Sequence, residues 1–209
     1  MAKKILFQGD SITDAQRNKE NEQYRGSGYA TLVAGALGFE RPNEFEFLNR
    51  GISGNRVTDL ISRIKKDIIN LTPDYMSILI GINDVWHELA CKNGVSEEKF
   101  ERYYNLLIED TKEALPNIKI MILEPFVLKG SATEEAWSEF RSETEKRAAA
   151  AKRVAEKNNL LFVPLMEKFD EAAKTAPCSY WLYDGVHPSA MGHELIKREW
   201  LKAFSALEK

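Results

Sequence analysis

Short apolar runs alternate with longer amphipathic segments along the whole chain. The runs are rich in Ile, Leu, Val and Phe, are bounded by turn residues, and cover residues 5–7, 45–48, 76–80, 118–123 and 160–163. Runs of this length with such boundaries are typical of strands buried in a parallel sheet. The pattern therefore predicts a central sheet of about five strands.

The segments between these runs carry apolar residues at helical spacing. The clearest segments cover residues 29–37, 57–69, 97–115, 134–158 and 190–207. In the segment 134–158, Trp137, Phe140 and Val154 stand among many Glu, Lys and Arg residues, as in a helix with one face on a sheet. Alternating strands and helices favour a parallel sheet with helices on both faces, so the expected fold class is α/β.

Nothing along the chain divides it into separate domains. The sequence has 209 residues and contains no Pro/Gly/Ser-rich linker, repeat or low-complexity tract. Its apolar fraction of 44% and charged fraction of 29% are ordinary for a globular protein. We therefore expect a single domain over residues 1–209.

Charge and hydropathy exclude several classes of partner. A formal net charge of −3 lacks the clustered basic excess of a nucleic-acid-binding protein. No stretch approaches the roughly 18 apolar residues of a membrane span, and the run at residues 5–7 is too short for a signal-peptide core. Cys91 and Cys178 are too few for a disulfide framework, so two free thiols are expected. We therefore expect a cytoplasmic protein that binds neither nucleic acid nor membrane.

Four short polar sequences follow predicted strands or precede the last predicted helix. They are Gly-Asp-Ser-Ile-Thr-Asp at 9–14, Asn-Arg-Gly-Ile-Ser-Gly-Asn at 49–55, Gly-Ile-Asn-Asp at 81–84 and Asp-Gly-Val-His-Pro at 184–188. In an open parallel sheet, ligands bind at the carboxyl ends of the strands, beside the point where the strand order reverses. We therefore expect these residues to converge on one edge of the sheet and to form a site.

Ser11 is the candidate nucleophile, because it follows the first predicted strand where a turn would expose its hydroxyl. A serine hydroxyl reacts only when an adjacent base takes its proton. His187 can be that base, and Asp184 can accept the Nδ1 proton of the imidazole and hold its tautomer. Because Asp-x-x-His is common by chance, a solvated loop histidine is an equally good interpretation of this pair taken alone.

Three groups are candidates for stabilising the oxyanion that acyl transfer would generate. They are the backbone N–H of Ser11, the backbone N–H of Gly54, which has no Cβ to hinder close approach, and the side-chain amide of Asn83. Taken singly, Gly54 fits a plain turn, and Asn83 fits the N-cap of a helix that starts before Val85. As an ordered set, these residues favour catalysis.

The ordered set resembles the four sequence blocks of the SGNH, or GDSL-type, hydrolases. Ser11 in Gly-Asp-Ser, Gly54 in Gly-Ile-Ser-Gly-Asn, Asn83 in Gly-Ile-Asn-Asp and His187 in Asp-Gly-Val-His stand in family order and spacing. The resemblance implies a three-layer α/β/α sandwich with flavodoxin-like topology and a catalytic triad of Ser11, Asp184 and His187. It also implies an oxyanion hole formed by the Ser11 and Gly54 amides and the Asn83 side chain. No Gly-x-Ser-x-Gly pentapeptide surrounds Ser11, which argues against an α/β-hydrolase.

Further motifs resemble one branch of this class, the intracellular acetyl-xylooligosaccharide esterases. They include Gly-Tyr at 28–29, Pro-Asp-Tyr at 73–75, Ile-Gly-Ile-Asn-Asp-Val-Trp at 80–86, Pro-Phe at 125–126 and His-Pro-Ser-Ala-Met-Gly-His at 187–193. This branch implies removal of acetyl groups from short xylan fragments through an acyl-enzyme, without cofactor or metal, and often by a homo-oligomer. One departure is Tyr183, which stands where the branch tends to have Trp.

Asp10, Trp86 and Tyr183 are the candidates for contacts with the substrate. The two aromatic residues flank the motif loops, as do Tyr180 and Trp181, and aromatic faces suit stacking on pyranose rings. Packing at the rim of the core is the alternative interpretation for each ring.

The remaining polar residues near the motifs have structural interpretations. His193 lies in the last predicted helix, where a structural hydrogen bond is expected, and His87 is expected at the surface or the rim of the site. Asp14 and Asp84 are candidates either for orienting the motif loops or for capping local structure. None of the four is assigned to the chemistry.

Three alternative functions stay open at the level of sequence. A lysophospholipase or thioesterase of the same class differs only in its acyl pocket. A metal-dependent phosphohydrolase would use carboxylates that follow strands as ligands, namely Asp10, Asp14, Asp84 and Asp184 with His187. A non-catalytic sugar-binding protein is the third, since a fold does not guarantee a function.

Overall fold

Five parallel strands form the centre of the computed structural model, which describes residues 2–208. They are β1 (Lys3–Gly9), β2 (Phe45–Asn49), β3 (Tyr75–Leu79), β4 (Lys119–Leu123) and β5 (Leu161–Val163). Each coincides with a strand that the apolar runs predict, with ends that differ by no more than two residues. The predicted parallel sheet is therefore confirmed.

Helices occupy most of the segments between the strands. They are α1 (Ser11–Asp14), α2 (Tyr29–Glu40), α3 (Val57–Ser62), α4 (Ile64–Asp67), the 3-10 turn η1 (Ile69–Leu71), α5 (Ile82–Cys91), α6 (Glu97–Ala114), α7 (Trp137–Lys157), α8 (Met166–Ala173), α9 (Cys178–Trp181) and α10 (Ala190–Leu207). Four predicted helices, at 29–37, 97–115, 134–158 and 190–207, are confirmed as α2, α6, α7 and α10.

The prediction of one continuous helix over residues 57–69 is wrong. Arg63 adopts φ −116° and ψ 11°, which ends α3 and separates it from α4. Its guanidinium turns inward and donates hydrogen bonds to the carbonyl oxygens of Arg50 at 2.8 Å and Gly9 at 3.1 Å. Apolar spacing does not report such a tertiary contact, so the break is invisible in the pattern.

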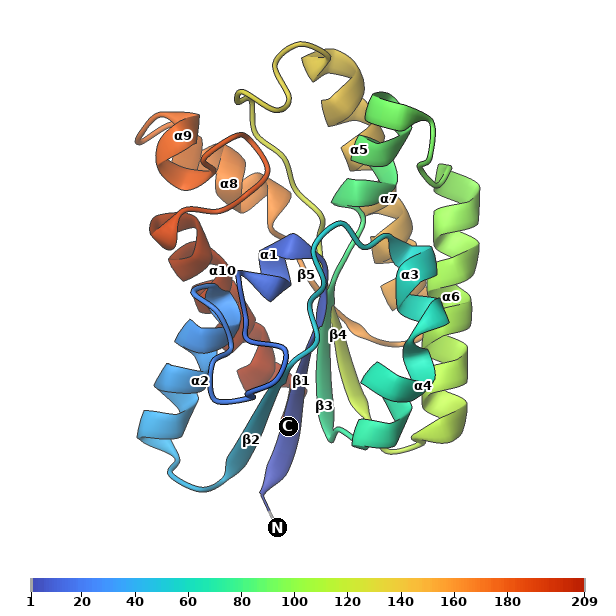
Figure 1. Ribbon diagram of the computed structural model, residues 1–209, viewed down its shortest axis with the longest axis vertical. Coiled ribbons are helices and arrows are strands. Elements are labelled where there is room, and N and C mark those ends of the chain that lie inside the picture. The colour runs from blue at the N-terminus through green and yellow to red at the C-terminus, as the bar shows by residue number, and fades with distance from the viewer. Residues whose placement is uncertain (1, 209) are drawn as a thin grey trace.

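The two faces of the sheet bury alternate residues of each strand, because successive side chains of a strand point to opposite sides. In β1, Ile5 and Phe7 pack with α2 and α10, whereas Leu6 packs with α3, α6 and α7. Figure 1 shows the result: α2, α8, α9 and α10 cover one face, and α3 to α7 cover the other. The fold is therefore the three-layer α/β/α sandwich that the family resemblance implies.

The strand order β2-β1-β3-β4-β5 reverses direction beside β1. This is the flavodoxin-like order, in which ligands bind beyond the carboxyl ends of β1 and β3. Ser11 lies two residues after β1, and Asn83 lies four residues after β3. The sheet thus brings two distant candidate residues to the edge where a site is expected.

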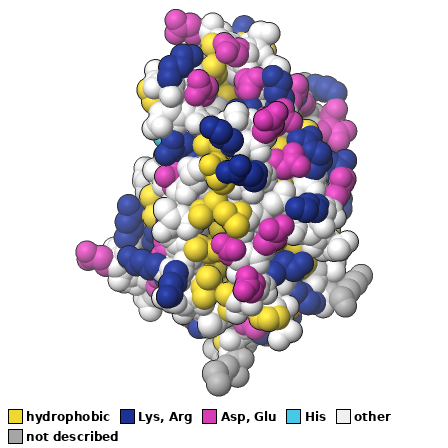
Figure 2. Space-filling view, turned by 90° about the vertical axis from the view of Figure 1, so that its right-hand side faces the viewer, with side chains coloured by type: hydrophobic (Ala, Val, Ile, Leu, Met, Phe, Trp, Pro, Cys, Tyr) yellow, Lys and Arg dark blue, Asp and Glu magenta, His cyan; other side chains and the backbone are white. Residues whose placement is uncertain are grey.

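The surface over α6 carries both signs of charge. Figure 2 shows Lys or Arg and Asp or Glu side chains interspersed around a band of hydrophobic side chains on this face. Ion pairs join α6 to α7, with Arg153 Nη2 at 2.7 Å from Glu101 Oε2 and Lys157 Nζ at 3.3 Å from Glu109 Oε1. Such mixed charge differs from the basic stripe of a nucleic-acid-binding face.

Two further sequence expectations concern the helices and the cysteines. None of the helices within residues 2–208 combines the length and the apolar character that crossing a bilayer requires. Cys91, at the end of α5, and Cys178, at the start of α9, are both free thiols. The expectation of two free thiols is confirmed.

Candidate active site

Ser11 opens a single helical turn directly beyond β1. Asp10 caps this turn, because its Oδ1 accepts a hydrogen bond from the Ile12 N–H at 3.0 Å. The turn ends at Ala15, which has a left-handed conformation. This short turn holds the half-buried Ser11 side chain at the edge of the sheet.

The loop before α10 brings the predicted base to Ser11. Ser11 Oγ lies 3.0 Å from His187 Nε2, and His187 Nδ1 lies 2.7 Å from Asp184 Oδ2. The other carboxylate oxygen of Asp184 accepts hydrogen bonds from the backbone N–H groups of Val186 at 2.9 Å and His187 at 2.8 Å. One carboxylate therefore fixes both the loop and the imidazole, and a hydroxyl, an imidazole and a carboxylate form one continuous chain.

Electrostatics keeps Asp184 charged and favours protonation of His187. Burial raises the pKa of Asp184, but the hydrogen bonds from the His187 side chain and from the His187 and Val186 amides outweigh it and lower this pKa to about 2. The hydrogen bond to Asp184 raises the pKa of His187 above its ordinary value, against the opposing effect of burial. An imidazole in this position is well suited to accept a proton from a serine hydroxyl.

The loop that carries Gly54 is tied to both sides of the site. The Ile52 N–H donates to the carbonyl of Gly9 at 3.1 Å, next to the Ser11 turn. On the other side, Asn83 Nδ2 donates to the carbonyl of Asn55 at 3.1 Å. Gly54 has φ +81°, and a Cβ there would meet no described atom within 4 Å, so its backbone conformation rather than crowding favours glycine. The three candidate oxyanion donors are thus linked by hydrogen bonds through one loop.

Asn83 lies in the first turn of α5 and is 6% exposed. The alternative of Asn83 as a helix N-cap is wrong, because α5 begins at Ile82 and Gly81 is its N-cap. The hydrogen bond to Asn55 uses one of the two protons of the Asn83 amide. No other hydrogen bond from this amide to residues 2–208 is present, so its second proton has no acceptor among them.

Two acidic residues lock the loop to its neighbours. Asp14 Oδ2 accepts from the Ser53 hydroxyl at 3.0 Å and from the Ser53 N–H at 3.2 Å. Asp84 accepts from the Val57 N–H at 3.2 and 3.3 Å through its two oxygens. The expectation that Asp14 and Asp84 orient the motif loops agrees with these contacts.

Arg63, which the sequence did not single out, links three parts of the site. Besides the Gly9 and Arg50 carbonyls, it donates to Asn55 Oδ1 at 2.8 Å and Asp67 Oδ2 at 3.1 Å. Since Gly9 precedes the Ser11 turn and the Asn55 carbonyl accepts from Asn83, Arg63 holds these two parts of the candidate site in place. In the sequence, Arg63 is one of several charged residues of an expected helix, and nothing in the pattern marks it as part of the site.

Ser11 and His187 line a hollow of about 310 Å³. Gln16, Ser27 and Ser53 supply polar groups to its wall, and the ring of Tyr183, 67% exposed, lies at its margin. The sequence analysis did not identify Gln16, Ser27 or Ser53 as site residues. Ser53 lies within the 49–55 motif and could have been considered, whereas Gln16 and Ser27 belong to no recognisable motif. The hollow can accommodate a small polar molecule against the serine.

The three residues predicted to contact substrate differ in exposure. Tyr183 lines the hollow, and the ring of Trp86, half-buried, lies 5.8 Å from the His187 ring and packs edge-on against Phe140. Asp10 is 1% exposed, and burial raises its pKa to about 7. A direct contact of Asp10 with substrate therefore does not fit the structure, because its carboxylate lies beneath the surface.

The other two histidines lie where the sequence interpretation put them. His193 Nδ1 accepts a hydrogen bond from the Tyr29 N–H at 3.1 Å, so its expected structural role is confirmed. Burial, with the nearby charge of His187, lowers the pKa of His193 to about 4. His87 is half-buried in α5.

Among residues 2–208, no three His, Cys, Asp or Glu side chains are arranged to hold a metal ion. Asp14 and Asp84 accept hydrogen bonds from Ser53 and Val57, and Asp184 is engaged by His187. The ligand set required by the phosphohydrolase alternative is therefore not assembled.

Comparison with known families gives a match over most of the chain. The model of the GDSL-like lipase/acylhydrolase family matches residues 7–195. This span contains all four motifs and every residue of the Ser11–His187–Asp184 chain.

Known proteins and solved structures agree with that match. An acetylxylan esterase from Geobacillus stearothermophilus is 34% identical over 95% of this chain and 92% of its own. Its crystal structure superimposes with a TM-score of 0.86 over 96% of this chain and 93% of that one, at 34% identity. A protein described as a GDSL-like lipase from Parabacteroides merdae is 39% identical, with a TM-score of 0.92 over 99% and 98% of the two chains. Further structures of the Geobacillus enzyme, with alanine in place of a serine or an aspartate, are described as catalytic mutants.

Proposed function

Since this chain belongs to the GDSL-like lipase/acylhydrolase family and is a carboxylic ester hydrolase, we propose that it cleaves short-chain acetyl esters through an acyl-enzyme on Ser11. The substrates we propose are O-acetyl groups on xylo-oligosaccharides or other small carbohydrates. The observation that carries the proposal is the unbroken chain from Ser11 Oγ to His187 Nε2, at 3.0 Å, and from His187 Nδ1 to Asp184, at 2.7 Å. This is the arrangement that serine acyl transfer requires.

In the first half of the proposed cycle, Ser11 Oγ attacks the carbonyl carbon of the ester while His187 Nε2 takes the hydroxyl proton. Asp184 stays ionised, holds the Nδ1 proton and stabilises the imidazolium. The tetrahedral intermediate carries its negative charge on the former carbonyl oxygen. The Ser11 and Gly54 N–H groups and the free proton of the Asn83 amide are the donors we assign to that oxygen.

The second half releases the two products. Collapse of the intermediate breaks the bond to the sugar oxygen, which takes the proton from His187 and leaves as an alcohol. Water then loses a proton to His187 and attacks the acetyl-enzyme. The second intermediate expels Ser11, which recovers its proton from His187, and acetic acid leaves and ionises to acetate in solution. His187 thus carries the proton in each transfer among Ser11, the leaving alcohol and the attacking water, and the proton of the acid product goes to solvent.

The substrate class rests on the relatives and on the hollow beside Ser11. One solved structure, 33% identical to this chain, is that of an acetyl-xylooligosaccharide esterase from Geobacillus. The polar wall of the hollow, from Gln16, Ser27 and Ser53, offers hydrogen-bonding partners to a sugar, and Tyr183 offers an aromatic face. Tyr183 in place of the usual Trp keeps an aromatic ring at this margin, with a smaller surface for stacking.

A cytoplasmic location and a homo-oligomeric state stay predictions. Light scattering of the purified protein measures its oligomeric state directly. A mass equal to one chain at micromolar concentration would contradict it.

Replacement of the nucleophile tests the mechanism. Ser11→Ala should remain folded and lose activity by about 10⁴-fold or more in kcat, because only binding and oxyanion stabilisation would remain. Ser205→Ala, an exposed serine at the far end of α10, is the matched control and should keep full activity. Turnover by Ser11→Ala close to that of the control would refute the assignment.

An acyl-chain series tests the substrate class. Rates with p-nitrophenyl acetate, butyrate and octanoate, followed by acetylated xylo-oligosaccharides, should fall steeply beyond acetate. A rate that rises with chain length would instead support the lysophospholipase or thioesterase alternative, which needs a deep apolar acyl pocket. Binding of acetylated sugar without any turnover would support the non-catalytic alternative.

A further inference from the structure

A second hollow adjoins the one beside Ser11. It measures about 480 Å³, and the two share Gln16 and Ser27 in their walls. Its remaining wall comes from the segment between α1 and α2 and from the first turns of α2, through Asn18, Gln23, Tyr24, Arg25, Gly26 and Thr31. A molecule bound at Ser11 can therefore extend over Gln16 and Ser27 without leaving a concave surface.

The chemistry of this wall is that of a neutral, hydroxyl-rich ligand. Asn18, Gln23 and Gln16 are exposed and carry amide groups, which both donate and accept hydrogen bonds. The ring of Tyr24 is 65% exposed and offers an apolar face with a polar tip. Among the described residues that line the second hollow, none is acidic and one, Arg25, is cationic.

Arg25 does not turn the second hollow into an anion site. Its Nε donates to the Phe47 carbonyl at 3.1 Å, and its Nη1 donates to the Gln23 carbonyl at 3.3 Å. The guanidinium is therefore engaged in holding the loop against the edge of β2. The Oδ1 of Asn18 accepts from the Glu20 N–H at 2.9 Å, so the Asn18 NH2 group, the Gln16 and Gln23 amides and the Tyr24 ring are the exposed groups that a ligand can contact.

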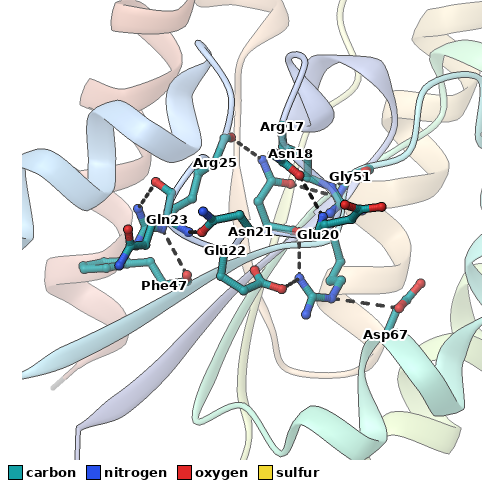
Figure 3. A network of polar contacts seen from close by, with 12 residues as sticks. Arg17, Asn18, Glu20, Asn21, Glu22, Gln23, Arg25, Phe47, Gly51 and Asp67 are labelled. Carbon is teal, nitrogen blue, oxygen red and sulfur yellow. Dashed lines mark hydrogen bonds and ion pairs between the residues drawn. The ribbon is translucent and has the colours of Figure 1, made fainter.

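The wall is held in place before any ligand binds. The Asn18 N–H donates to the Tyr24 carbonyl at 2.9 Å and closes the loop on itself. Asn49 Nδ2 donates to the Arg25 carbonyl at 2.8 Å, and Glu22 pairs with Arg50 at 2.6 Å. Figure 3 shows this loop beside the end of β2, with Arg25 reaching Phe47 and Arg17 reaching Gly51. Because the loop is already ordered, binding would lose little conformational entropy.

The residue between the two hollows has an unusual backbone conformation. Ala15 and Gln16 are consecutive non-glycine residues with φ +42° and +65°. Such residues cost free energy and persist only where their surroundings hold them, which the Ser27 N–H does by donating to the Ala15 carbonyl at 2.8 Å. Left-handed backbone of this kind is concentrated at ligand sites, and here it occurs at Gln16, which lines both hollows.

We propose that the second hollow is a subsite for a further sugar residue of the acetylated oligosaccharide whose ester lies at Ser11. This inference rests on the proposed function, since it takes the hydrolysed ester to be carried by a sugar. Tyr24 stacks on the pyranose ring, and Gln16, Asn18 and Gln23 bind its hydroxyl groups. The subsite makes the enzyme prefer oligosaccharide esters over the ester of a single sugar.

The test compares kcat/KM for acetylated xylotriose with kcat/KM for acetylated xylose. The wild-type ratio should exceed one, and Tyr24→Ala should lower it by about three- to tenfold, the effect expected for one aromatic contact. Tyr24→Phe, which keeps the ring, should retain most of the ratio. Phe39→Ala is the matched control, because Phe39 is 88% exposed at the end of α2 and lines neither hollow; its ratio should equal that of the wild type.

The outcomes separate this inference from the proposed function. A wild-type ratio near one, or an unchanged ratio in Tyr24→Ala, overturns the subsite while p-nitrophenyl acetate hydrolysis by the wild type still supports an acetylesterase. Absence of wild-type activity on every acetyl ester would overturn the proposed function itself. If the ratio of kcat/KM values fell equally in Tyr24→Ala and Phe39→Ala, the effect of Tyr24→Ala would be indirect, and the subsite would also be overturned.

Discussion

Two carboxylates near Ser11 have opposite environments. Asp184 accepts three hydrogen bonds from the loop that carries His187, and its pKa falls to about 2. Asp10, adjacent to Ser11, is 1% exposed, and its Oδ2 has no hydrogen-bond partner among residues 2–208. Burial therefore dominates and raises the pKa of Asp10 to about 7.

The two histidines of the site repeat this contrast. The hydrogen bond to Asp184 raises the pKa of His187, whereas burial lowers the pKa of His193 to about 4. Ionised Asp184 and protonatable His187 thus lie in one loop, while Asp10 and His193 are groups that burial favours in the neutral form. Pairs of like residues whose environments separate their pKa values mark which of them can serve in proton transfer. Here the hydrogen-bonded members are the ones aligned with Ser11.

Of the substitutions that test this contrast, removal of the charge on Asp184 should have the largest effect, a loss of kcat. Asp184→Asn should lower kcat by about 10⁴-fold, because the amide favours the wrong imidazole tautomer and no longer stabilises the imidazolium. Steady-state kinetics with p-nitrophenyl acetate measures the loss. Asp110→Asn, on α6, is the matched control with no expected change. A loss of less than tenfold would show that Asp184 does not orient the base.

The same variant should move the pH profile. His187 must be neutral to accept a proton, so wild-type kcat/KM should fall as pH drops through a value above the ordinary histidine pKa of about 6.5. Without the carboxylate, the midpoint of this fall should shift to lower pH. A wild-type profile that is flat down to about pH 4 would contradict a histidine base.

The sheet could be predicted from sequence because buried parallel strands are locally apolar. Runs such as 76–80 need no tertiary information to be recognised, and their alternation with amphipathic segments determines the layers. The pattern failed where a tertiary contact decides the structure. The helix expected over 57–69 breaks at Arg63, whose guanidinium is held by carbonyls about 13 and 54 positions away in sequence. The one-turn helices α1 and α9 are too short for a 3.6-residue period to appear.

The site was predictable to the extent that its chemistry requires particular residue types. Ser11, Asp184 and His187 were found because acyl transfer needs a hydroxyl, a carboxylate and an imidazole, and parallel strands end at one edge. Gln16 and Ser27 were not found, because many polar residues can line a hollow and only tertiary folding selects them. Asp10 was wrongly predicted to contact the substrate. Its position next to Ser11 in the sequence suggested that it is exposed, but whether a side chain is buried depends on the tertiary packing around it.

A substitution at Asp10 tests the buried carboxylate of the pair. It should have the next largest effect, on how the free energy of unfolding depends on pH. The pKa of Asp10 is higher in the folded state than the ordinary 3.8, so its stabilising contribution is complete below about pH 4 and is lost as pH rises through about 7. Asp10→Asn cannot ionise. Its free energy of unfolding relative to wild type should therefore increase by about 2–3 kcal/mol between pH 5 and pH 8.

Urea unfolding at the two pH values measures this difference. Asp74→Asn, whose carboxylate accepts from the Lys4 N–H at an exposed position, is the control and should not show the rise with pH. A difference between wild type and Asp10→Asn that stays constant from pH 5 to pH 8 would mean that the carboxylate finds a partner and ionises normally.

His193 should show the smallest effect, with the opposite dependence on pH. Its folded pKa of about 4 lies below the ordinary 6.5, so its contribution is present above about pH 6.5 and is lost as pH falls toward 4. His193→Gln cannot take up a proton, and its amide oxygen can still accept the hydrogen bond from the Tyr29 N–H. Between pH 7 and pH 5, wild type should lose about 1–2 kcal/mol more stability than this variant, again measured by urea unfolding. If both proteins lost stability equally, His193 would titrate like a solvent-exposed imidazole, and burial could not be what separates it from His187.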